Sequence, residues 1–448
     1  MSKRAREENE LRVEKHDSGF MGPLAMFATF PHNATFEESR EVKINASPVN
    51  ADADVYTFVH HNQPYGILRT EDATIRAKMR FRNVAGPHAV PAAGQIIAPL
   101  PLPLRLGWKS KEVHVNGDLI QPITAYESEL NYVNYLLTRV PSGYNGFEKV
   151  CLGYLDTPGH MDDRTRIDSY TEATCVNKGA GRRGTLFDNG AENYVIDDID
   201  LLGHNRRYLP SSMEIKVVLT RLEKVKYIFG TTADAQAAKM ELHDLHVHIP
   251  VFKPVAQLAE AINESMIQKS EECKFYTTNY RYVAKPMAAG AQRVQWNDMF
   301  NGARPARTIV YVKTQARYNG AHQLNPNLMA FPDINQFAIK INEAIVPPEI
   351  HNSQEAYVEL RRVLDRRYSE MPFSYDDYVS SYGMIVSDLT TNKDSYNQML
   401  PNSTSGIVSL DMTFTQATGA DQQLICIGEF RNQLNLGYHT RARNKYDY

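Results

Sequence analysis

The sequence repeats itself at a spacing of half its length, and this limits the folds open to it more than any other feature. Residues 113–122 (VHVNGDLIQP) align position by position with residues 339–348 (IKINEAIVPP), at an offset of 226 in a chain of 448 residues. Self-similarity at a fixed spacing is the signature of a duplicated structural unit. The sequence therefore predicts two related domains in tandem, which the length also favours because one hydrophobic core rarely serves so long a chain.

Both copies of the repeat predict a β-hairpin followed by a helix. Each copy alternates β-branched with other residues up to a turn, at 116–117 (NG) or 342–343 (NE), and returns as an apolar strand that a proline is expected to end. Asn-Gly favours a type I′ turn, which needs positive φ at both central residues. The second copy lacks the glycine, so its turn type stays open. Helices are predicted over 128–137 and 354–363, each with a glutamate at its second position.

Later landmarks occur in the same order in both halves. Pro210 precedes a predicted strand at 215–220, and Pro401 precedes one at 410–415. The two prolines are 191 residues apart, so the first copy carries 35 extra residues, which must lie between Pro122 and Pro210. Both halves then close with a further strand.

These landmarks predict a mainly β protein of two tandem β-sandwiches with short helices and long loops. The 25 Tyr and 17 Phe residues agree, since aromatic side chains favour strands. A linking helix is predicted over 254–267, where proline lies near the first position and apolar residues form one stripe. The predicted segments are an N-terminal arm and lead-in (1–50), a first sandwich (51–252) with a loop insertion at about 140–205, a helical linker (253–272), a second sandwich (273–436) and a C-terminal tail (437–448).

The charge balance excludes a protein that coats nucleic acid with its whole surface. Asp and Glu number 52 against 49 Lys and Arg, for a formal net charge of −3, whereas such coats need a strongly basic surface. Contact with nucleic acid or other internal components is expected only locally, at the basic runs 3–6 (KRAR) and 441–445 (RARNK). Solvated tails are the favoured interpretation of both runs, and such contact is the alternative.

The cysteines and the hydropathy favour a reduced protein without a membrane anchor. Cys151, Cys175, Cys273 and Cys426 lie far apart and include no Cys-x-x-Cys pair. This spacing predicts reduced, partly buried thiols and neither a disulfide framework nor a zinc site. The N-terminus is charged, so no signal peptide is predicted, and no apolar run is long enough to be a transmembrane segment.

Two short motifs resemble nucleotide sites but lack the parts that hold a nucleotide. Residues 156–160 (DTPGH) match the switch motif of translational GTPases, yet the chain contains no Gly-Lys dipeptide and therefore no P-loop. Residues 179–184 (GAGRRG) match the dinucleotide-binding pattern, but polar residues precede them and 185–190 predict a strand or turn. Both motifs are predicted to be loop sequences.

Several polar clusters could bind a metal, but each lacks a complete ligand set. His246 and His248 share one face of a predicted strand at 245–249, with His243 nearby, and no acid or cysteine is placed to complete a metal site. A polar face towards solvent or the neighbouring sandwich is predicted there. The pair at 60–61 (HH) also lacks partners.

An acidic segment and an aromatic run complete the candidates. The segment's spacing does not match an EF-hand, so a solvated loop is predicted, with the carboxylates at most capping nearby amides. The aromatic run could be a carbohydrate platform, but packing of a loop or subunit interface is favoured. No catalytic, cofactor-binding or metal-binding residue is predicted, and no cofactor. The acidic residues are Asp156, Asp162, Asp163 and Asp168, and the aromatic residues are Tyr368, Phe373, Tyr375, Tyr378 and Tyr382.

The order of these motifs resembles the double jelly-roll major capsid proteins of Polinton-like elements and their viral relatives, which share a fold with adenovirus hexon. Residues 97–117 (IAPLPLPLRLGWKSKEVHVNG) are similar to an apolar run that leads into the V-x-V-N-G hairpin of that family. Residues 155–162 (LDTPGHMD) are similar to a loop after its helix, and residues 307–312 and 334–342 to the opening of its second half.

The resemblance implies a structural protein and not an enzyme. Three copies of a two-barrel subunit would place six barrels around a threefold axis, as a pseudo-hexagonal capsomer of an icosahedral shell. The implied partners are further copies of the chain, in a homotrimer and in neighbouring capsomers, and minor or penton capsid proteins. The implied location is the virion, after synthesis in the host cytoplasm or nucleus.

Two alternatives remain. The first is a minor or vertex capsid protein, although vertex proteins of this kind usually carry one jelly roll and this chain carries a duplication. The second is a soluble β-sandwich that binds carbohydrate.

Overall fold

The computed structural model describes residues 35–61, 66–84, 91, 94–139, 147–202, 207–365, 370–397, 399–401, 404–437 and 442–445. The basic run at 3–6 lies outside the described residues, as does Arg441 of the C-terminal run. Tyr368 of the aromatic run also lies outside them.

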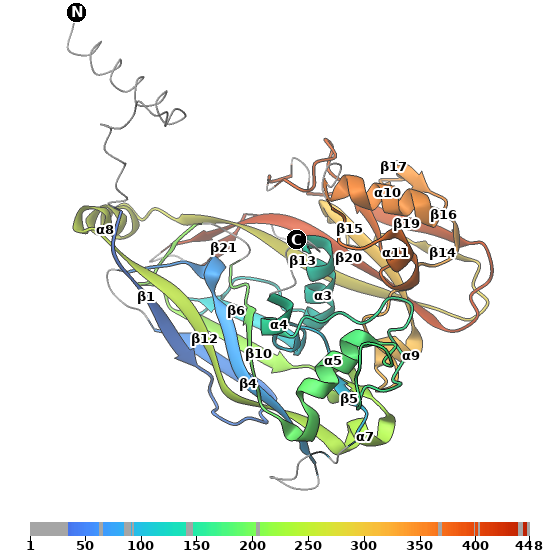
Figure 1. Cartoon of the computed structure of the whole chain (residues 1–448). Helices are drawn as coiled ribbons and strands as arrows, with labels where there is room; N and C mark the ends of the chain where they lie inside the picture. Colours follow the sequence, from blue (N-terminus) through green and yellow to red (C-terminus); the bar gives the residue numbers. More distant parts are fainter. Residues whose placement is uncertain are drawn as a thin grey trace, which may run out of the picture.

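The first half of the chain folds as two antiparallel sheets that face each other (Figure 1). One sheet has the order β8-β4-β12-β1, and the other has the order β2-β10-β6-β7. The strands of the first sheet are β1 (Phe36–Asn45), β4 (Thr74–Asn83), β8 (Asn193–Asp198) and β12 (Ala238–Pro254), with the short strands β3 (Ile67–Leu68) and β9 (Leu209–Pro210) at one end. The second sheet contains β2 (Val55–His60), β6 (Trp108–Val115), β7 (Asp118–Leu119) and β10 (Ile215–Arg221).

The second half repeats this arrangement. Its sheets have the orders β18-β15-β20-β13 and β14-β19-β16-β17. Their strands are β13 (Cys273–Met287), β15 (Arg307–Thr314), β18 (Ile385–Asp388) and β20 (Gln422–Leu436), and β14 (Arg293–Trp296), β16 (Ile334–Ile341), β17 (Ala344–Ile350) and β19 (Val408–Phe414). A short strand, β21 (Arg443–Asn444), pairs with β20, and β5 (Ile97–Pro99) pairs with β11 (Ile228–Gly230).

The two halves correspond strand for strand, so the predicted duplication is present in the fold. In both halves the first strand pairs with the last, and the third long strand lies on the other side of that last strand. This order of two four-stranded Greek-key sheets is that of a jelly roll. The predicted fold of two tandem jelly rolls is confirmed.

The repeated hairpins form as predicted, with one correction. Asn116 and Gly117 have φ values of 51° and 86°, and Asn342 and Glu343 have 48° and 70°, so both turns keep positive φ at their two central residues. A glycine is not required at the second turn. The prediction that a proline ends the return strand is wrong for the second hairpin, because β17 continues through residues 347–348 to Ile350, with a register shift in its pairing to β16.

The helix that follows each hairpin is also confirmed, as α3 (Glu127–Thr138) and α10 (Ser353–Val363). In the linker, α8 (Ala256–Asn263) continues into a π-helical turn (Glu264–Gln268). The strand before the linker, β12, ends at Pro254, and the strand after it, β13, begins at Cys273. The remaining helices are α2 (Pro103–Leu106), α4 (Phe147–Cys151), α5 (Lys178–Leu186), α6 (Lys224–Tyr227), α7 (Thr232–Ala237), α9 (Gln315–Asn319) and α11 (Tyr375–Ser381).

Two of the predicted segment boundaries need correction. Residues 36–45, assigned to the N-terminal arm, form β1, which pairs with β12 along its length, so the first barrel begins before residue 51. The insertion at about 140–205 is not a loop throughout. It contains α4, α5 and β8, and β8 is a strand of the first barrel.

The core of each barrel lies between its two sheets. In β4 alternate side chains are buried, from Ile75 to Phe81, as expected for a strand with one apolar face. Helix α3 belongs to the first half of the chain but packs its apolar residues into the core cluster of the second half, among them Tyr132 and Leu136. It lies between the two barrels (Figure 1) and therefore joins them.

Candidate functional site

The junction between the barrels contains a buried charged network centred on Glu129 of α3. Its carboxylate accepts hydrogen bonds from the hydroxyls of Tyr311 (2.8 Å) and Tyr282 (3.2 Å) and pairs with the Lys313 ammonium at 3.0 Å. The Lys313 side chain is 3% exposed. All three partners come from β13 and β15, so one carboxylate of the first half holds three polar groups of the second.

The pKa shifts of this pair agree with an internal ion pair. Burial alone would raise the pKa of Glu129, but Lys313 and the Tyr311 hydroxyl outweigh it and hold the pKa below its usual value. Burial lowers the pKa of Lys313, and Glu129 offsets this only in part. Because burying a charge is costly unless a partner compensates it, each group depends on the other.

Aromatic rings extend this contact at the start of α3. The rings of Tyr126 and Tyr282 are stacked, with centroids 3.8 Å apart and an interplanar angle of 13°. The Tyr126 hydroxyl lies 3.0 Å from that of Tyr318 in α9. Stacked rings add apolar contact to a hydrogen-bonded interface, so this part of the junction combines both kinds of contact.

The segment 153–163, which includes the GTPase-like motif, forms the second part of the junction. Asp156 pairs with Arg183 of α5 at 2.8 Å, and both side chains are at most 1% exposed. The other carboxylate oxygen accepts a hydrogen bond from the side-chain amide of Asn325, at 2.8 Å, in the second half. Asp156 is therefore a buried structural residue, and the prediction of a solvated acidic loop is wrong for it.

Asp162 makes a second connection to the same region. It forms a two-pronged ion pair with the Arg317 guanidinium and accepts the backbone N–H of Asn325 at 2.7 Å. Between the two aspartates, Gly159 has a φ of +76° and donates its N–H to the Ser381 hydroxyl at 2.8 Å. The predicted turn is present, but it is docked on the second barrel. Asp163 does cap an amide, that of Thr165 (2.7 Å), as expected for this segment.

The glycine-rich motif 179–184 is a helix, α5, and not the predicted loop. The Asn177 side chain caps it by accepting the N–H of Ala180 at 3.3 Å, as expected for an N-cap residue. Gly179 is required because a Cβ there would lie 2.0 Å from the backbone oxygen of Leu155. The glycines thus permit α5 to lie directly against the segment that carries Asp156.

Gly179→Ala is expected to lower the free energy of unfolding by about 3 kcal/mol, because the added methyl meets backbone atoms that cannot yield without moving the helix. Urea denaturation followed by fluorescence measures the change. Gly419→Ala is the matched control, since a Cβ at this exposed glycine meets nothing within 4 Å. Equal effects for the two substitutions would show that α5 does not pack this closely.

The three histidines lie on the polar face of β12, opposite the core and beside β1, as predicted for a polar strand face, although one of them is buried there. His246 is 3% exposed, and its ring lies 4.9 Å from that of His248. His248 contacts Glu41 of β1 at 2.8 Å. Burial lowers the pKa of His246. The shared face of the two histidines is confirmed, and the apolar residues between them face the core.

The aromatic run packs inside the second half. Phe373, Tyr378 and Tyr382 are each at most 6% exposed, and their rings contact one another at 5.2 to 6.0 Å. The favoured prediction of packing is therefore confirmed for these three, and they present no flat surface for a sugar.

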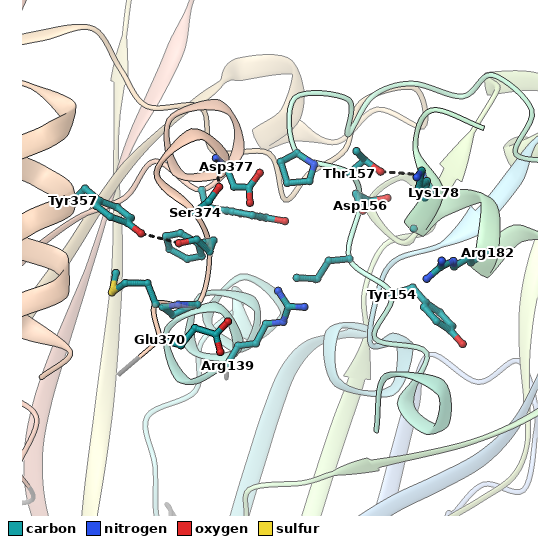
Figure 2. A pocket seen from close by; sticks show the side chains of 17 residues that line it. Arg139, Tyr154, Asp156, Thr157, Lys178, Arg182, Tyr357, Glu370, Ser374 and Asp377 are labelled. Atoms are coloured by element: carbon teal, nitrogen blue, oxygen red, sulfur yellow. Dashed lines mark hydrogen bonds between the residues drawn. The ribbon is translucent and has the colours of Figure 1, made fainter. Parts of the chain in front are cut away.

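A pocket of about 620 Å³ opens where the two halves meet. In Figure 2 the side chains of Tyr357, Ser374 and Asp377 line one wall, and Thr157 and Lys178 line the other. Its lining mixes charges of both signs, and the Asp156 carboxylate at its edge is already paired with Arg183. This arrangement supports contact between the halves.

The described residues contain neither a candidate metal cluster nor a helix that could span a membrane. Among the described residues, no group of three or more His, Cys, Asp and Glu side chains could hold a metal ion. All four cysteines are free thiols, and three of them are buried. In the same part of the chain, no helix has the length and apolar character needed to cross a membrane.

The paired barrels and the junction between them define the class of protein as one with a double jelly-roll fold. Solved structures of viral capsids share it. The chain matches the Sputnik virophage structure with a TM-score of 0.63 at 9% identity, over 96% of this chain and 93% of that one. The PBCV-1 capsid matches with a TM-score of 0.58 at 10% identity, over 94% and 100% of the two chains.

The mavirus major capsid protein matches with a TM-score of 0.52 at 12% identity, over 95% of each chain. No family model and no curated protein matches this sequence. The predicted resemblance to double jelly-roll capsid proteins is thus confirmed, and at these identities it is the fold that the matches establish.

Sequence reasoning missed the residues that join the barrels. The sequence indicates Glu129 only as a repeated helix position and Asn325 only as part of the family resemblance, and it predicts no role for Lys313 or Arg317. Lys313 does carry a signal, since it follows the apolar run 309–312 at a position where a strand is expected to continue. Its partner is 184 residues away in the sequence, so the pair itself has no local pattern.

Proposed function

We propose that this chain is the major subunit of an icosahedral viral capsid and that three copies form a pseudo-hexagonal capsomer. The observation that carries the proposal is the duplicated jelly roll, matched over nearly the full length of both chains in each capsid relative. Two barrels in one subunit give six barrels in a trimer, and six similar units can surround a threefold axis as a hexagonal tile. A structural and non-enzymatic role is consistent with a junction whose charged groups satisfy one another.

The rigidity of the junction also supports this role. A capsomer subunit must keep its two barrels at one angle, because every contact in the shell depends on it. The Glu129 network, the Asp156–Asn325 hydrogen bond and the Asp162–Arg317 ion pair connect the barrels at three points. Buried polar groups of this kind make one arrangement much more stable than others, since any other arrangement leaves charges unpaired.

The remaining partners and the location belong to the same proposal. Copies in neighbouring capsomers and minor or penton proteins would bind at the rim, and the basic termini could contact nucleic acid or internal components. The protein would then reside in the virion. A minor capsid protein remains a weaker reading, because the duplication provides two barrels where a vertex subunit needs one. No described feature favours carbohydrate binding.

Light scattering coupled to size-exclusion chromatography tests the proposal. We expect a particle of about 152 kDa, three times the subunit mass of 50.8 kDa, or larger assemblies built from it. The measurement should be repeated at low and high salt and across neutral to mildly acidic pH, because weak multivalent contacts respond to both. A monomer under every condition would refute a trimeric capsomer.

A further inference from the structure

The two repeat-equivalent helices differ in what covers them. Helices α3 and α10 follow equivalent hairpins, and their residues align at the offset of 226. Tyr132 and Tyr135 of α3 pack into the core cluster of the second half and are each 2% exposed, and Ser128, one turn before Tyr132, is 6% exposed. The residues at the same positions of α10 are Gln354, Val358 and Arg361, and all three are exposed.

The exposed residues of α10 form one stripe along the helix. Positions 354, 358 and 361 are four and three residues apart, a spacing that places side chains on the same helix face. Val358, in the middle, is 66% exposed, whereas Tyr132, its equivalent, is in the core between the barrels. Glu355, next to this stripe, takes the place of Glu129. We call this surface the α10 face, made of Gln354, Glu355, Val358 and Arg361.

The surface that covers α3 is the outer side of the β18-β15-β20-β13 sheet. It contributes Tyr282, Tyr311 and Lys313 to the contact with Glu129. As a result β15 is buried on both sides, with every residue from Thr308 to Lys313 buried. An internal interface therefore joins the helix of the first barrel to the sheet of the second.

Among the described residues, the equivalent sheet of the first barrel has no such cover. In β4 only one side is buried, and the outer side carries Arg76, Lys78, Arg80 and Arg82. The neighbouring strands add Lys43, Lys239, Glu41, Glu241 and the three histidines. We call this surface the β4 face. The Lys78 side chain at its centre is 49% exposed.

We propose that the α10 face of one copy packs on the β4 face of a second copy of this chain. The contact would repeat between copies the internal contact that α3 makes with the β15 sheet, and it rests on the proposed capsomer. Glu355 takes the place of Glu129, and the β4 face supplies cations where β15 supplies Lys313. The Glu355 carboxylate also accepts the His351 N–H at 2.7 Å within its own helix cap, so in the proposed contact it would serve both groups.

The geometry of one subunit fits this arrangement. Figure 1 shows α10 and the β1 and β4 strands at opposite sides of the molecule. Two different surfaces on opposite sides make a head-to-tail contact, which closes into a ring when the rotation allows it. Six barrels would then be joined by three internal contacts and three contacts between copies, all of one type.

Two substitutions on the two surfaces test the inference. Val358→Asp places a carboxylate where the contact needs an apolar group, and Lys78→Glu reverses a central charge of the β4 face. Each should raise the dissociation constant of the trimer at least about tenfold, and leave the circular dichroism spectrum unchanged because both residues are exposed in the single chain. Ile267→Asp is the matched control, since Ile267 is 45% exposed, lies in the π-helical turn Glu264–Gln268 and belongs to neither surface.

Dilution followed by light scattering distinguishes the outcomes. Dissociation of the first two variants, with an intact Ile267→Asp trimer, is the expected result. If Val358→Asp and Lys78→Glu both form trimers with the dissociation constant of the wild type, the inference is wrong, but the proposed capsomer is not affected. A wild-type chain that is monomeric throughout would overturn both.

Discussion

Asp156→Ala is expected to lower the free energy of unfolding by about 3 kcal/mol or more, the range measured when one partner of a buried ion pair is removed. The substitution leaves the Arg183 guanidinium, 1% exposed, without its carboxylate. It also removes the acceptor of the Asn325 amide, so the link between the barrels weakens together with the local fold. Urea denaturation gives the free energy, and hydrogen exchange should show faster opening of segment 153–163.

Asp168→Ala provides the control within the same acidic segment. Asp168 is partly exposed and contacts only its neighbour Ser169 among the described hydrogen bonds, so its loss should change stability by less than about 0.5 kcal/mol. If Asp156→Ala were as mild as Asp168→Ala, the buried ion pair would not be a structural link. Neither variant should alter nucleotide binding, because the motif lacks a P-loop. GTP-dependent assembly of the wild type that Asp156→Ala abolished would contradict this account.

Glu129→Ala is expected to destabilise the protein by a similar amount, about 3 kcal/mol or more, because Lys313 is then buried without an anion. The Tyr282 and Tyr311 hydroxyls also lose their acceptor. The interactions that Glu129→Ala removes lie between the barrels. Calorimetry should therefore show a lower melting temperature, and hydrogen exchange should become faster in α3 and β15.

A double substitution distinguishes the effect of losing the Glu129–Lys313 ion pair from the effect of losing side-chain packing. In Glu129→Gln with Lys313→Met, the glutamine still accepts hydrogen bonds from both tyrosines and the methionine needs no anion. Replacement of both members of a buried ion pair is often neutral, so this variant should recover most of the stability. A double variant as unstable as Glu129→Ala would show that the charges are not what stabilises the junction.

Local patterns were sufficient to predict the elements but not the contacts between them. The Asn116-Gly117 turn and the apolar spacing after it specify a hairpin and a helix within about 25 residues, and the structure contains both. Their recurrence at an offset of 226 then predicted a second barrel of the same order. This inference holds because the topology of a duplicated unit follows the first copy.

The junction could not be predicted because its partners are distant in the sequence. Asp156 meets Arg183 and Asn325, which are 27 and 169 residues away, and nothing near Asp156 distinguishes a buried carboxylate from a solvated one. The three glycines in 179–184 also disfavour a helix by propensity. The close approach of α5 to Leu155 requires Gly179, however, and tertiary packing outweighs the propensity there.

The assignment of β1 failed for a similar reason. Residues 36–45 are mostly polar and charged, and only Ile44 is fully buried, so their sequence gives little sign of a strand. Backbone pairing with β12 determines their conformation. β1 is equivalent to β13, the first strand of the second barrel. The signal for β1 therefore lies in the repeat and not in its own sequence.

Electron microscopy of the purified oligomer tests the central claim most directly. Class averages should show a hexagonal outline with six barrel-sized densities around a threefold axis, and a reconstruction should show every barrel contacting the next through a helix packed on a sheet. Particles with only two such densities, or an oligomer in which α10 faces solvent in every copy, would contradict it.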